Sequence, residues 1–352
     1  MVSCREELEL VTDQNTAVII GILNPNDNAH YIKVTRSFVG DGVTNTYDIA
    51  QIPDSSYFNQ VSVKVEEILN NNVLRTFQLH DTIIQSKDTN GLFYGPEQKV
   101  SVFYTTNAAP LRQDCKYRMT AKINNEQFII QAETDVVRGM GWGNIGGAYN
   151  YLTLVQDPGD YKTQIIPVTN VSKAKRLVGE VLFNYYDVFP NGDSTLQTVT
   201  IPLGEYDLSE GSSNYNFYLS GATFFQTLKS KIPVSSAVEV RRCSNIVINV
   251  TGANDVLASY IAVNKPTLSI AQNKPEYTNL KVIKGEKIKA IGIFGSRTTL
   301  QLVKPYASTI GQIQAISQNS RRELAIGPLT GNLGFCSWHQ ADINYGFHWA
   351  CQ

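Results

Sequence analysis

The sequence predicts a mainly β protein, in which an N-terminal immunoglobulin-like antiparallel β-sandwich precedes a C-terminal β-rich α+β domain. Over the first 137 residues, short apolar and β-branched segments alternate with turn signals. They number about seven, as an immunoglobulin-like sandwich requires, and long helical patterns are missing there. Charged residues make up only 17% of the chain, and uncharged polar residues and 18 tyrosines replace them. This composition also favours strands.

Each segment of the first domain carries its own strand or turn signal. Residues 16–23 are apolar and β-branched and stop at Asn24-Pro25-Asn26-Asp27. Residues 61–66 alternate valine with polar residues, the two-residue period of a half-buried strand. The asparagine pairs that follow residues 69 and 123 predict tight hairpin turns, because asparagine tolerates positive φ. The other predicted strands are residues 31–39, 73–79, 100–105, 117–123 and 128–132.

The glycine-rich stretch at residues 138–147 interrupts every periodicity and predicts a domain boundary. We expect the sandwich domain with an N-terminal lipid-anchor region at residues 1–137, a linker at 138–150 and the second domain at 151–352. The stretch also matches the dinucleotide fingerprint G-x-G-x-x-G at residues 141–146. That fingerprint needs a helix directly after it, and Pro158 and the pattern of residues 149–155 argue against one, so we favour the linker.

The second domain mixes strands with short helices. A long hairpin is predicted from residues 177–188 and 195–203 around the turn Phe189-Pro190-Asn191-Gly192-Asp193. One apolar helical face spans residues 224–232 and ends at Pro233. Another spans residues 256–261, with Asn254 or Asp255 as its N-cap. Further strands are expected at residues 246–250 and 288–294, and a turn at residues 157–159.

The charge balance argues against nucleic acid as a ligand. The chain has 30 Lys+Arg against 31 Asp+Glu, a net charge of -1, and no block of basic residues. Nucleic-acid binding needs a concentrated basic surface. No apolar run approaches the ~20 residues that a membrane-spanning helix needs.

Five cysteines form an odd set: Cys4, Cys115, Cys243, Cys336 and Cys351. In an exported protein, we expect Cys336 and Cys351 to form a disulfide that closes an aromatic-rich C-terminal loop. The alternative is a zinc site built from this pair with His339, His348 and Asp342. Whether Cys115 and Cys243 pair stays open at this point.

Catalytic signatures are sparse in the sequence. It contains neither G-x-S-x-G nor HExxH, and its four histidines have no recognisable catalytic neighbour. Glu66 and Glu67 point to opposite faces of a strand and are interpreted as solvated charges. We therefore predict no enzymatic activity, no cofactor and no metal site. Asp81-Thr82-Ile83 and Asp193-Ser194-Thr195 resemble bacterial O-glycosylation sites, but ordinary turn chemistry explains them equally well.

The N-terminus resembles that of a mature bacterial lipoprotein. Small or polar residues precede Cys4, which is the predicted lipidation site. Arg5, Glu6 and Glu7 then resemble the export signal that sends Bacteroidota lipoproteins to the outer leaflet. The alternative is an ordinary chain start with an unmodified cysteine. A lipid on Cys4 would account for the odd cysteine count.

Dispersed motifs extend this resemblance to both ends of the chain. Six stretches of the chain are similar to a Bacteroidota outer-membrane lipoprotein family, domain of unknown function 4249 or a close relative. They are CREELEL, TAVIIGIL and YIKVTRSFVG near the N-terminus, residues 263–280, GIFGSR at 292–297 and LGFCSW at 333–338. The resemblance implies an outer-membrane lipoprotein that is often encoded near TonB-dependent receptors. In GIFGSR, Gly292 and Gly295 permit close backbone approach or positive φ, and Arg297 is a candidate partner for a carboxylate.

Three functions follow from these observations. The leading hypothesis is a non-enzymatic, surface-exposed outer-membrane lipoprotein that a lipid on Cys4 holds in the membrane. It would act as an accessory subunit of an outer-membrane β-barrel complex. That complex would serve TonB-dependent uptake, secretion or outer-membrane protein assembly. The second is a glycan- or peptide-binding surface module. The third is a hydrolase with an unrecognised site. The candidate binding residues are Trp142, Tyr149, Tyr151, Arg297, Trp338 and Trp349.

Overall fold

The computed structural model describes residues 16–37, 53–85, 97–137, 139–146, 151–209, 213–264, 276–285, 288–305 and 315–351. The predicted mainly β fold class is confirmed, because strands dominate the described elements and most of them pair antiparallel. The chain divides into two compact units. Unit 1 comprises residues 1–137 and 253–297, and unit 2 comprises residues 138–252 and 298–352.

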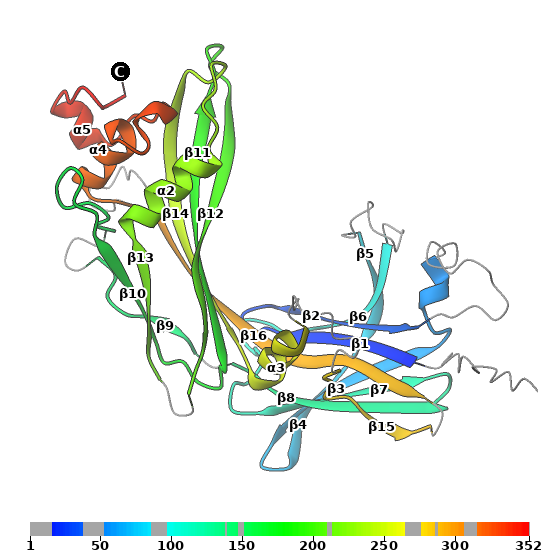
Figure 1. Ribbon diagram of the computed structural model, residues 1–352. Helices are drawn as coiled ribbons and strands as arrows, with labels where there is room; N and C mark the ends of the chain where they lie inside the picture. The colour runs from blue at the N-terminus through cyan, green and yellow to red at the C-terminus, as the bar shows by residue number, and fades with distance from the viewer. Residues whose placement is uncertain are drawn as a thin grey trace, which may run out of the picture. The chain divides into compact units, whose positions relative to one another are not determined.

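Unit 1 is a sandwich of two β-sheets (Figure 1). The strand order of the first sheet within this unit is β16-β1-β2-β6-β5, and the order of the second is β15-β8-β7-β3-β4. The bounds of the first set are β1 Thr16–Leu23, β2 Ala29–Arg36, β5 His80–Gln85, β6 Glu97–Tyr104 and β16 Lys289–Pro305. Those of the second are β3 Val61–Leu69, β4 Asn72–Gln78, β7 Lys116–Ile123, β8 Phe128–Asp135 and β15 Lys281–Lys284. A short 3-10 helix, η1, covers Pro53–Ser56.

The core of unit 1 lies between these sheets. Alternate residues of both sheets face inward, among them Ile19, Ile32, Val65 and Met119, and all four are buried in one cluster. The two asparagine turns are confirmed, because Asn70, Asn71, Asn124 and Asn125 all have positive φ. The alternation and turn chemistry visible in the sequence therefore set the register of the β3–β4 and β7–β8 hairpins.

One pairing in unit 1 departs from the predicted antiparallel arrangement. β1 runs parallel to β16, with Thr16 opposite Lys289 and Leu23 opposite Ser296. This long-range pairing also brings residues 253–297 into unit 1, although the sequence assigns them to the second domain. The strand itself was visible in the sequence, whereas a partner more than 250 residues away cannot be identified from local patterns.

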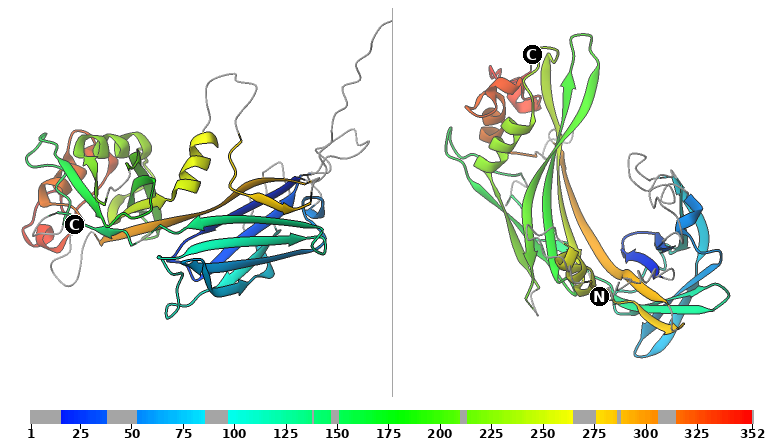
Figure 2. Two further views of the ribbon diagram at one scale, coloured as in Figure 1. Left: turned by 90° about the horizontal axis from the view of Figure 1, so that it is seen from below. Right: turned by 45° about the vertical axis from the view of Figure 1, so that its right-hand side comes forward.

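Unit 2 is built on long strands and a small second sheet. The strand order of its larger sheet is β12-β11-β14-β16, and that of its smaller sheet is β13-β10-β9. Only residues 298–305 of β16 belong to this unit. The strand bounds are β9 Gly141–Trp142, β10 Thr163–Thr169, β11 Arg176–Val188, β12 Ser194–Asp207, β13 Tyr215–Ser220 and β14 Val240–Ala253. Figure 2 shows the long β11–β12 hairpin from two directions.

Helical elements complete both units. Helix α2 covers Gly221–Lys231, α4 Gln318–Ile326, α5 Gln340–Asn344 and the 3-10 helix η3 Gly331–Leu333, all in unit 2, and α3 covers Asp255–Asn264 in unit 1. The predicted apolar face of α2 is confirmed, because Phe224, Phe225 and Leu228 are buried. At the start of α3, Oδ1 of Asn254 accepts a hydrogen bond from the Leu257 amide at 3.1 Å, so Asn254 is the N-cap.

The predicted linker is partly ordered structure. β9 pairs with β10 through Trp142 opposite Val168, and Met140 and Ile145 are buried. The Gly143 amide donates to the Pro167 carbonyl at 2.9 Å, and a Cβ on Gly143 would collide with the Pro167 ring. Close packing of one strand against another therefore explains part of this glycine-rich motif.

Among the described residues, no helix combines the length and the apolar character that crossing a bilayer requires.

Candidate functional site

The predicted aromatic residues that the structure describes all lie in unit 2, and Trp142, Trp338 and Trp349 are held there by hydrogen bonds or ring stacking. Trp142 is half-buried on β9, and its indole donates a hydrogen bond to the Gln301 carbonyl at 3.4 Å. Tyr151 is half-buried, and Tyr149 lies outside the described residues. The Trp338 indole donates to the Cys243 carbonyl at 2.6 Å. Trp349 is buried with its ring stacked on Phe347 at 4.9 Å.

The GIFGSR motif lies within strand β16, where Gly292 allows close packing against β1. Gly292 has φ +111°, and a Cβ there would collide with the Ile19 carbonyl on the paired strand. Gly295 has only ordinary contacts available to a Cβ. Arg297 is exposed on β16 and forms no salt bridge with the described residues. Cys4, Arg5, Glu6 and Glu7 lie outside the described part of the chain.

The C-terminal tail is closed by the predicted disulfide. Cys336 and Cys351 are joined, with their Cα atoms 5.0 Å apart. Arg321 donates to both Asp342 oxygens, at 2.5 and 2.8 Å, and the Ser337 hydroxyl also donates to Asp342 at 2.6 Å. All three polar residues are buried. These contacts anchor α4 to the tail, and the Asp342 carboxylate is bound by Arg321 and Ser337.

The structure does not support the zinc alternative in this tail. Both cysteines are used by the disulfide, and Asp342 is bound to Arg321. His339 caps α5, since its Nδ1 accepts from the Ala341 amide at 3.3 Å. The described residues contain no group of three or more histidine, cysteine or acidic side chains suited to a metal ion.

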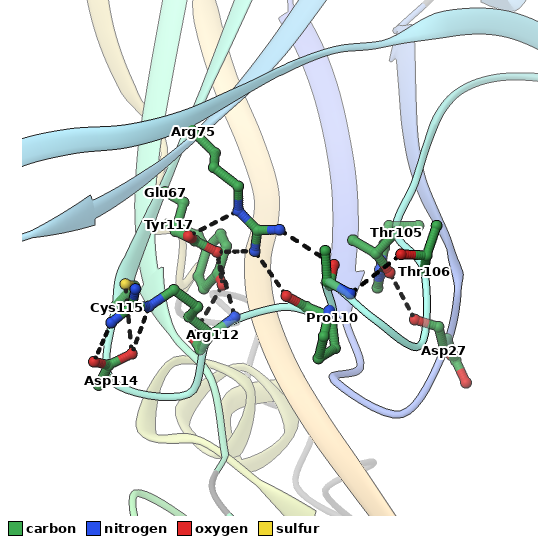
Figure 3. Close-up of polar contacts among 12 residues, drawn as sticks. Asp27, Glu67, Arg75, Thr105, Thr106, Pro110, Arg112, Asp114, Cys115 and Tyr117 are labelled. Atoms are coloured by element: carbon green, nitrogen blue, oxygen red, sulfur yellow. Dashed lines mark hydrogen bonds and ion pairs between the residues drawn. The ribbon is translucent and has the colours of Figure 1, made fainter.

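A buried carboxylate in unit 1 corrects the interpretation of Glu66 and Glu67. Glu67 is fully buried instead of solvated, next to an irregularity in the β3–β4 register. Its oxygens accept hydrogen bonds from Arg75 Nε at 2.9 Å and from the Tyr117 hydroxyl at 2.7 Å (Figure 3). The Arg112 amide donates to it at 3.3 Å. The alternation of β3 turns Glu67 inward, and sequence reasoning missed that Arg75 lies opposite it.

This network shifts the acid–base properties of its members. Burial alone would raise the pKa of Glu67, but the hydrogen bonds from Arg75 and Tyr117 outweigh it and lower that pKa. Burial and the Glu67 carboxylate together raise the pKa of Tyr117. Arg75 also donates to the carbonyls of Ala109 and Pro110, at 3.2 and 2.7 Å. We interpret the network as the anchor of the segment that leads into β7.

Two adjoining pockets of unit 1 form a groove, which we call the sandwich groove. Its deeper part has a volume of 420 Å³ and its shallower part 510 Å³, and the two share Asn59, Val61 and Asp81. The deeper part is also lined by Val34, Tyr57, Phe58, Ile83, Lys99 and Ser101. The shallower part adds Gln60, Ser62, Lys122, Asn125 and Glu126. Volumes of this size suit small-molecule ligands.

The elements around the groove hold its side chains in fixed places. Ser101 on β6 donates to Asp81 on the paired strand β5 at 3.1 Å. The Tyr57 hydroxyl accepts from the Lys99 amide at 3.1 Å, and the Lys99 ammonium lies 5.4 Å from the Tyr57 ring centre. The Asn124 amide donates to the Gln60 carbonyl at 2.9 Å. These contacts tie the segment before β3 to both sheets.

The β7–β8 turn presents two of the groove residues. Asn124, Asn125 and Glu126 have φ of 52°, 54° and 64°, so three consecutive residues adopt the left-handed conformation. Glutamate rarely occupies this region, and the conformation costs free energy. Glu126 is fixed by Lys122, whose ammonium is 2.6 Å from its carboxylate, and this pairing lowers the pKa of Glu126.

Sequence reasoning missed the groove. It identified Asn124-Asn125 as a turn and residues 61–66 as a strand, but it had no signal for Tyr57-Phe58-Asn59-Gln60. These four residues acquire a role only because the fold brings them next to residues of β5, β6 and the β7–β8 turn. Residues that are far apart in the chain and meet only in the folded protein leave no local pattern in the sequence.

Comparisons with known proteins show no family. No family model matches the chain, and no curated protein matches it. One solved structure that it resembles is the C-terminal globular domain of an oligosaccharyltransferase from Pyrococcus abyssi, with 12% identity and a TM-score of 0.19. The match covers 57% of this chain and 38% of that chain, so this chain corresponds to well under half of that protein domain.

Proposed function

We propose that the protein is a surface-exposed outer-membrane lipoprotein that acts as a non-enzymatic accessory subunit of an outer-membrane β-barrel complex. A lipid on Cys4 anchors it, and Arg5, Glu6 and Glu7 direct it to the outer leaflet. The barrel partner serves TonB-dependent uptake, secretion or outer-membrane protein assembly. The resemblance of the N-terminus and of the dispersed motifs to Bacteroidota outer-membrane lipoproteins supports this assignment.

The observation that carries the proposal is the Cys336–Cys351 disulfide. Disulfides persist in extracytoplasmic compartments and are rare in reducing ones. Cys115 and Cys243 are free thiols, and both are buried. With one bridge formed and two thiols enclosed, Cys4 is the remaining cysteine, as a lipid-modified N-terminus requires.

Exposed apolar side chains at the sheet edges support a role in protein contact. Among the described strands, the second sheet of unit 1 ends with β4 on one side and β15 on the other. Val73 and Leu74 on β4, and Val282 and Ile283 on β15, are all exposed. Edge strands that expose apolar side chains are suited to pairing with another chain.

Native purification from membranes tests this proposal. We expect the full-length protein to co-purify with an outer-membrane β-barrel protein in near-stoichiometric amount after mild detergent extraction. Cys4→Ser removes the sulfur that carries the lipid, so this variant should leave the membrane fraction. Ser3→Ala keeps a small residue before Cys4 and serves as the matched control. Recovery of the wild-type protein alone, without any barrel, would contradict the accessory-subunit role.

A second candidate function is a glycan- or peptide-binding surface module. The sandwich groove favours it, because the groove combines an apolar floor with amide and carboxylate side chains. Ligand sites commonly have this mixture of apolar lining and a few placed polar groups. Mutations in the groove that abolish ligand binding while membrane anchoring stays intact would separate this function from the first.

A further inference from the structure

The charged side chains of the sandwich groove balance one another. Two lysines, Lys99 and Lys122, face two carboxylates, Asp81 and Glu126. Lys122 is paired with Glu126 at 2.6 Å, and the Lys99 ammonium lies over the Tyr57 ring. A groove with no excess of either sign gives no long-range attraction for an anionic or a cationic ligand. Its charge pattern therefore favours a neutral occupant.

The shallower part of the groove is rich in groups that both donate and accept hydrogen bonds. Asn59, Gln60 and Asn125 each carry an amide with two donors and an accepting oxygen, and Asn59 and Gln60 are exposed. Asp81 is exposed, and Ser101 is its one hydrogen-bonding partner among the described residues. Vicinal hydroxyl groups of a sugar donate and accept alike, so they match such a lining.

The deeper part of the groove supplies an apolar surface next to these polar groups. Phe58 packs against the core of unit 1, and Val34 and Ile83 line the same pocket. Ile83 is 51% exposed and therefore available for contact. The C–H faces of a sugar ring pack well on apolar and aromatic side chains, whereas its hydroxyl edges need polar partners. The groove provides both, side by side.

A peptide occupant fits this geometry less well. Peptides that add to a sheet are held by unpaired backbone groups of an edge strand. β5 is the last described strand of its sheet, and side chains of β5 and of its paired strand β6 line the groove, where Asp81 pairs with Ser101 and Ile83 with Lys99. These side chains are the groups that an occupant of the groove would meet, so recognition would depend on side-chain hydrogen bonds and ring packing.

We infer that the sandwich groove binds a neutral oligosaccharide, with Asn59, Asp81 and Asn125 as hydrogen-bonding residues and Phe58 and Ile83 as the apolar floor. This inference rests on the second candidate function above and names its ligand class. It is independent of the lipid anchor and of the barrel partner.

Calorimetric titration of the full-length protein tests the inference. The probes are neutral tetra- to hexasaccharides derived from glucan, mannan, xylan and chitin, an acidic hexagalacturonate and a set of uncharged hexapeptides. We expect at least one neutral oligosaccharide to bind, with an affinity that changes less than about twofold between low and high salt, because no net charge is neutralised. Hexagalacturonate should bind at least about tenfold more weakly.

Two variants and a matched control locate the site. Asn59→Ala with Asn125→Gly removes two amides, and glycine keeps the positive φ at position 125. We expect this double variant to bind the oligosaccharide at least about tenfold more weakly, and Asp81→Asn about fivefold more weakly. Asn216→Ala on β13 removes an exposed amide in unit 2 and should bind as the wild type does. Equal thermal unfolding of all variants confirms that they fold.

Each outcome decides the inference. Binding of a neutral oligosaccharide that the groove variants weaken supports it. Peptide binding weakened by the same variants, without oligosaccharide binding, overturns the glycan assignment but keeps the binding-module function. Oligosaccharide binding that the groove variants leave unchanged overturns the site. Binding of none of the probes overturns both the glycan assignment and the binding module.

Discussion

Glu67 shows how one side chain can organise a segment of this fold. The alternation of β3 places Glu67 on the inward face, but the sequence does not show that Arg75 and Tyr117 lie next to it. Burial of an isolated charge is unfavourable, and Arg75, Tyr117 and the Arg112 amide offset that cost. The same residues hold the chain that leads into β7. The network of Glu67, Arg75, Tyr117 and Arg112 therefore stabilises a short segment of the fold.

Replacing Glu67 by glutamine should destabilise the protein. The variant loses the charge that binds Arg75, and we expect the free energy of unfolding to fall by about 2 kcal/mol at neutral pH. Urea unfolding measures this change. Glu133→Gln is the control, because Glu133 is exposed and its pair with Arg118 is a surface pair worth less than about 1 kcal/mol. An equal loss in both variants would contradict the role assigned to Glu67.

The contribution of Glu67 should depend on pH in a defined direction. Its pKa in the folded protein lies below the ordinary value of 4.5, so the folded state binds fewer protons than the unfolded state. The stabilisation is complete above pH 4.5 and is lost as the pH falls toward the lower folded-state pKa. The stability gap between wild type and Glu67→Gln should narrow over that range in urea unfolding. A gap that widens on acidification would contradict this account.

The two free thiols should be inert in the native protein. Cys115 and Cys243 are buried, and burial raises the pKa of both thiols. A raised pKa lowers the thiolate fraction, which is the reactive species. Mass spectrometry after iodoacetamide treatment at about pH 8 should find both unmodified in native protein and both modified in urea. Rapid alkylation of either thiol in the native protein would contradict its burial in the folded chain.

At the scale of elements, local signals predicted hairpins and helix ends well. The asparagine turns, the β11–β12 hairpin and the Asn254 cap all follow from residue types at particular positions. The parallel β1–β16 pair and the sandwich groove did not follow, because both join segments that are distant in the chain. The groove depends on residues 57–60, whose composition carries no strand or helix signal.

Gly292 tests the close approach of β16 to β1. Gly292→Ala places a Cβ against the Ile19 carbonyl at a positive φ, and we expect a loss of at least about 2 kcal/mol. Gly295→Ala, three residues further along the same strand, meets only contacts of 3.4 Å or more and should cost less than about 1 kcal/mol. Thermal unfolding of the pair checks this difference. Equal melting temperatures would contradict the parallel register.

The Cys336–Cys351 disulfide should stabilise the tail of unit 2. Its sequence separation is 15 residues, for which loop-closure entropy predicts about 3 kcal/mol. Replacing both cysteines by serine should lower the stability of this unit and increase amide hydrogen exchange around the Arg321–Asp342 pair first. Unchanged exchange in α4 and α5 would show that the buried ion pair holds the tail without the bridge.

At the scale of the whole molecule, the chain comprises two β-rich units whose residues alternate along the sequence. The first break between the units falls between residues 137 and 138. The return of residues 253–297 to unit 1 could not be predicted, because it depends on strand pairing across most of the chain. The proposed function depends on both ends: a lipid on Cys4 and a disulfide near the C-terminus.

Intact-mass analysis of the protein extracted from its native membrane tests the central claim most directly. The account predicts a mature chain that starts at Cys4, carries a diacyl or triacyl modification there, and contains one disulfide and two free thiols. Digestion then locates the lipid on the Cys4 peptide and the bridge between Cys336 and Cys351. A chain with an unmodified Cys4, or a reduced C-terminal pair, would contradict the assignment to the cell surface.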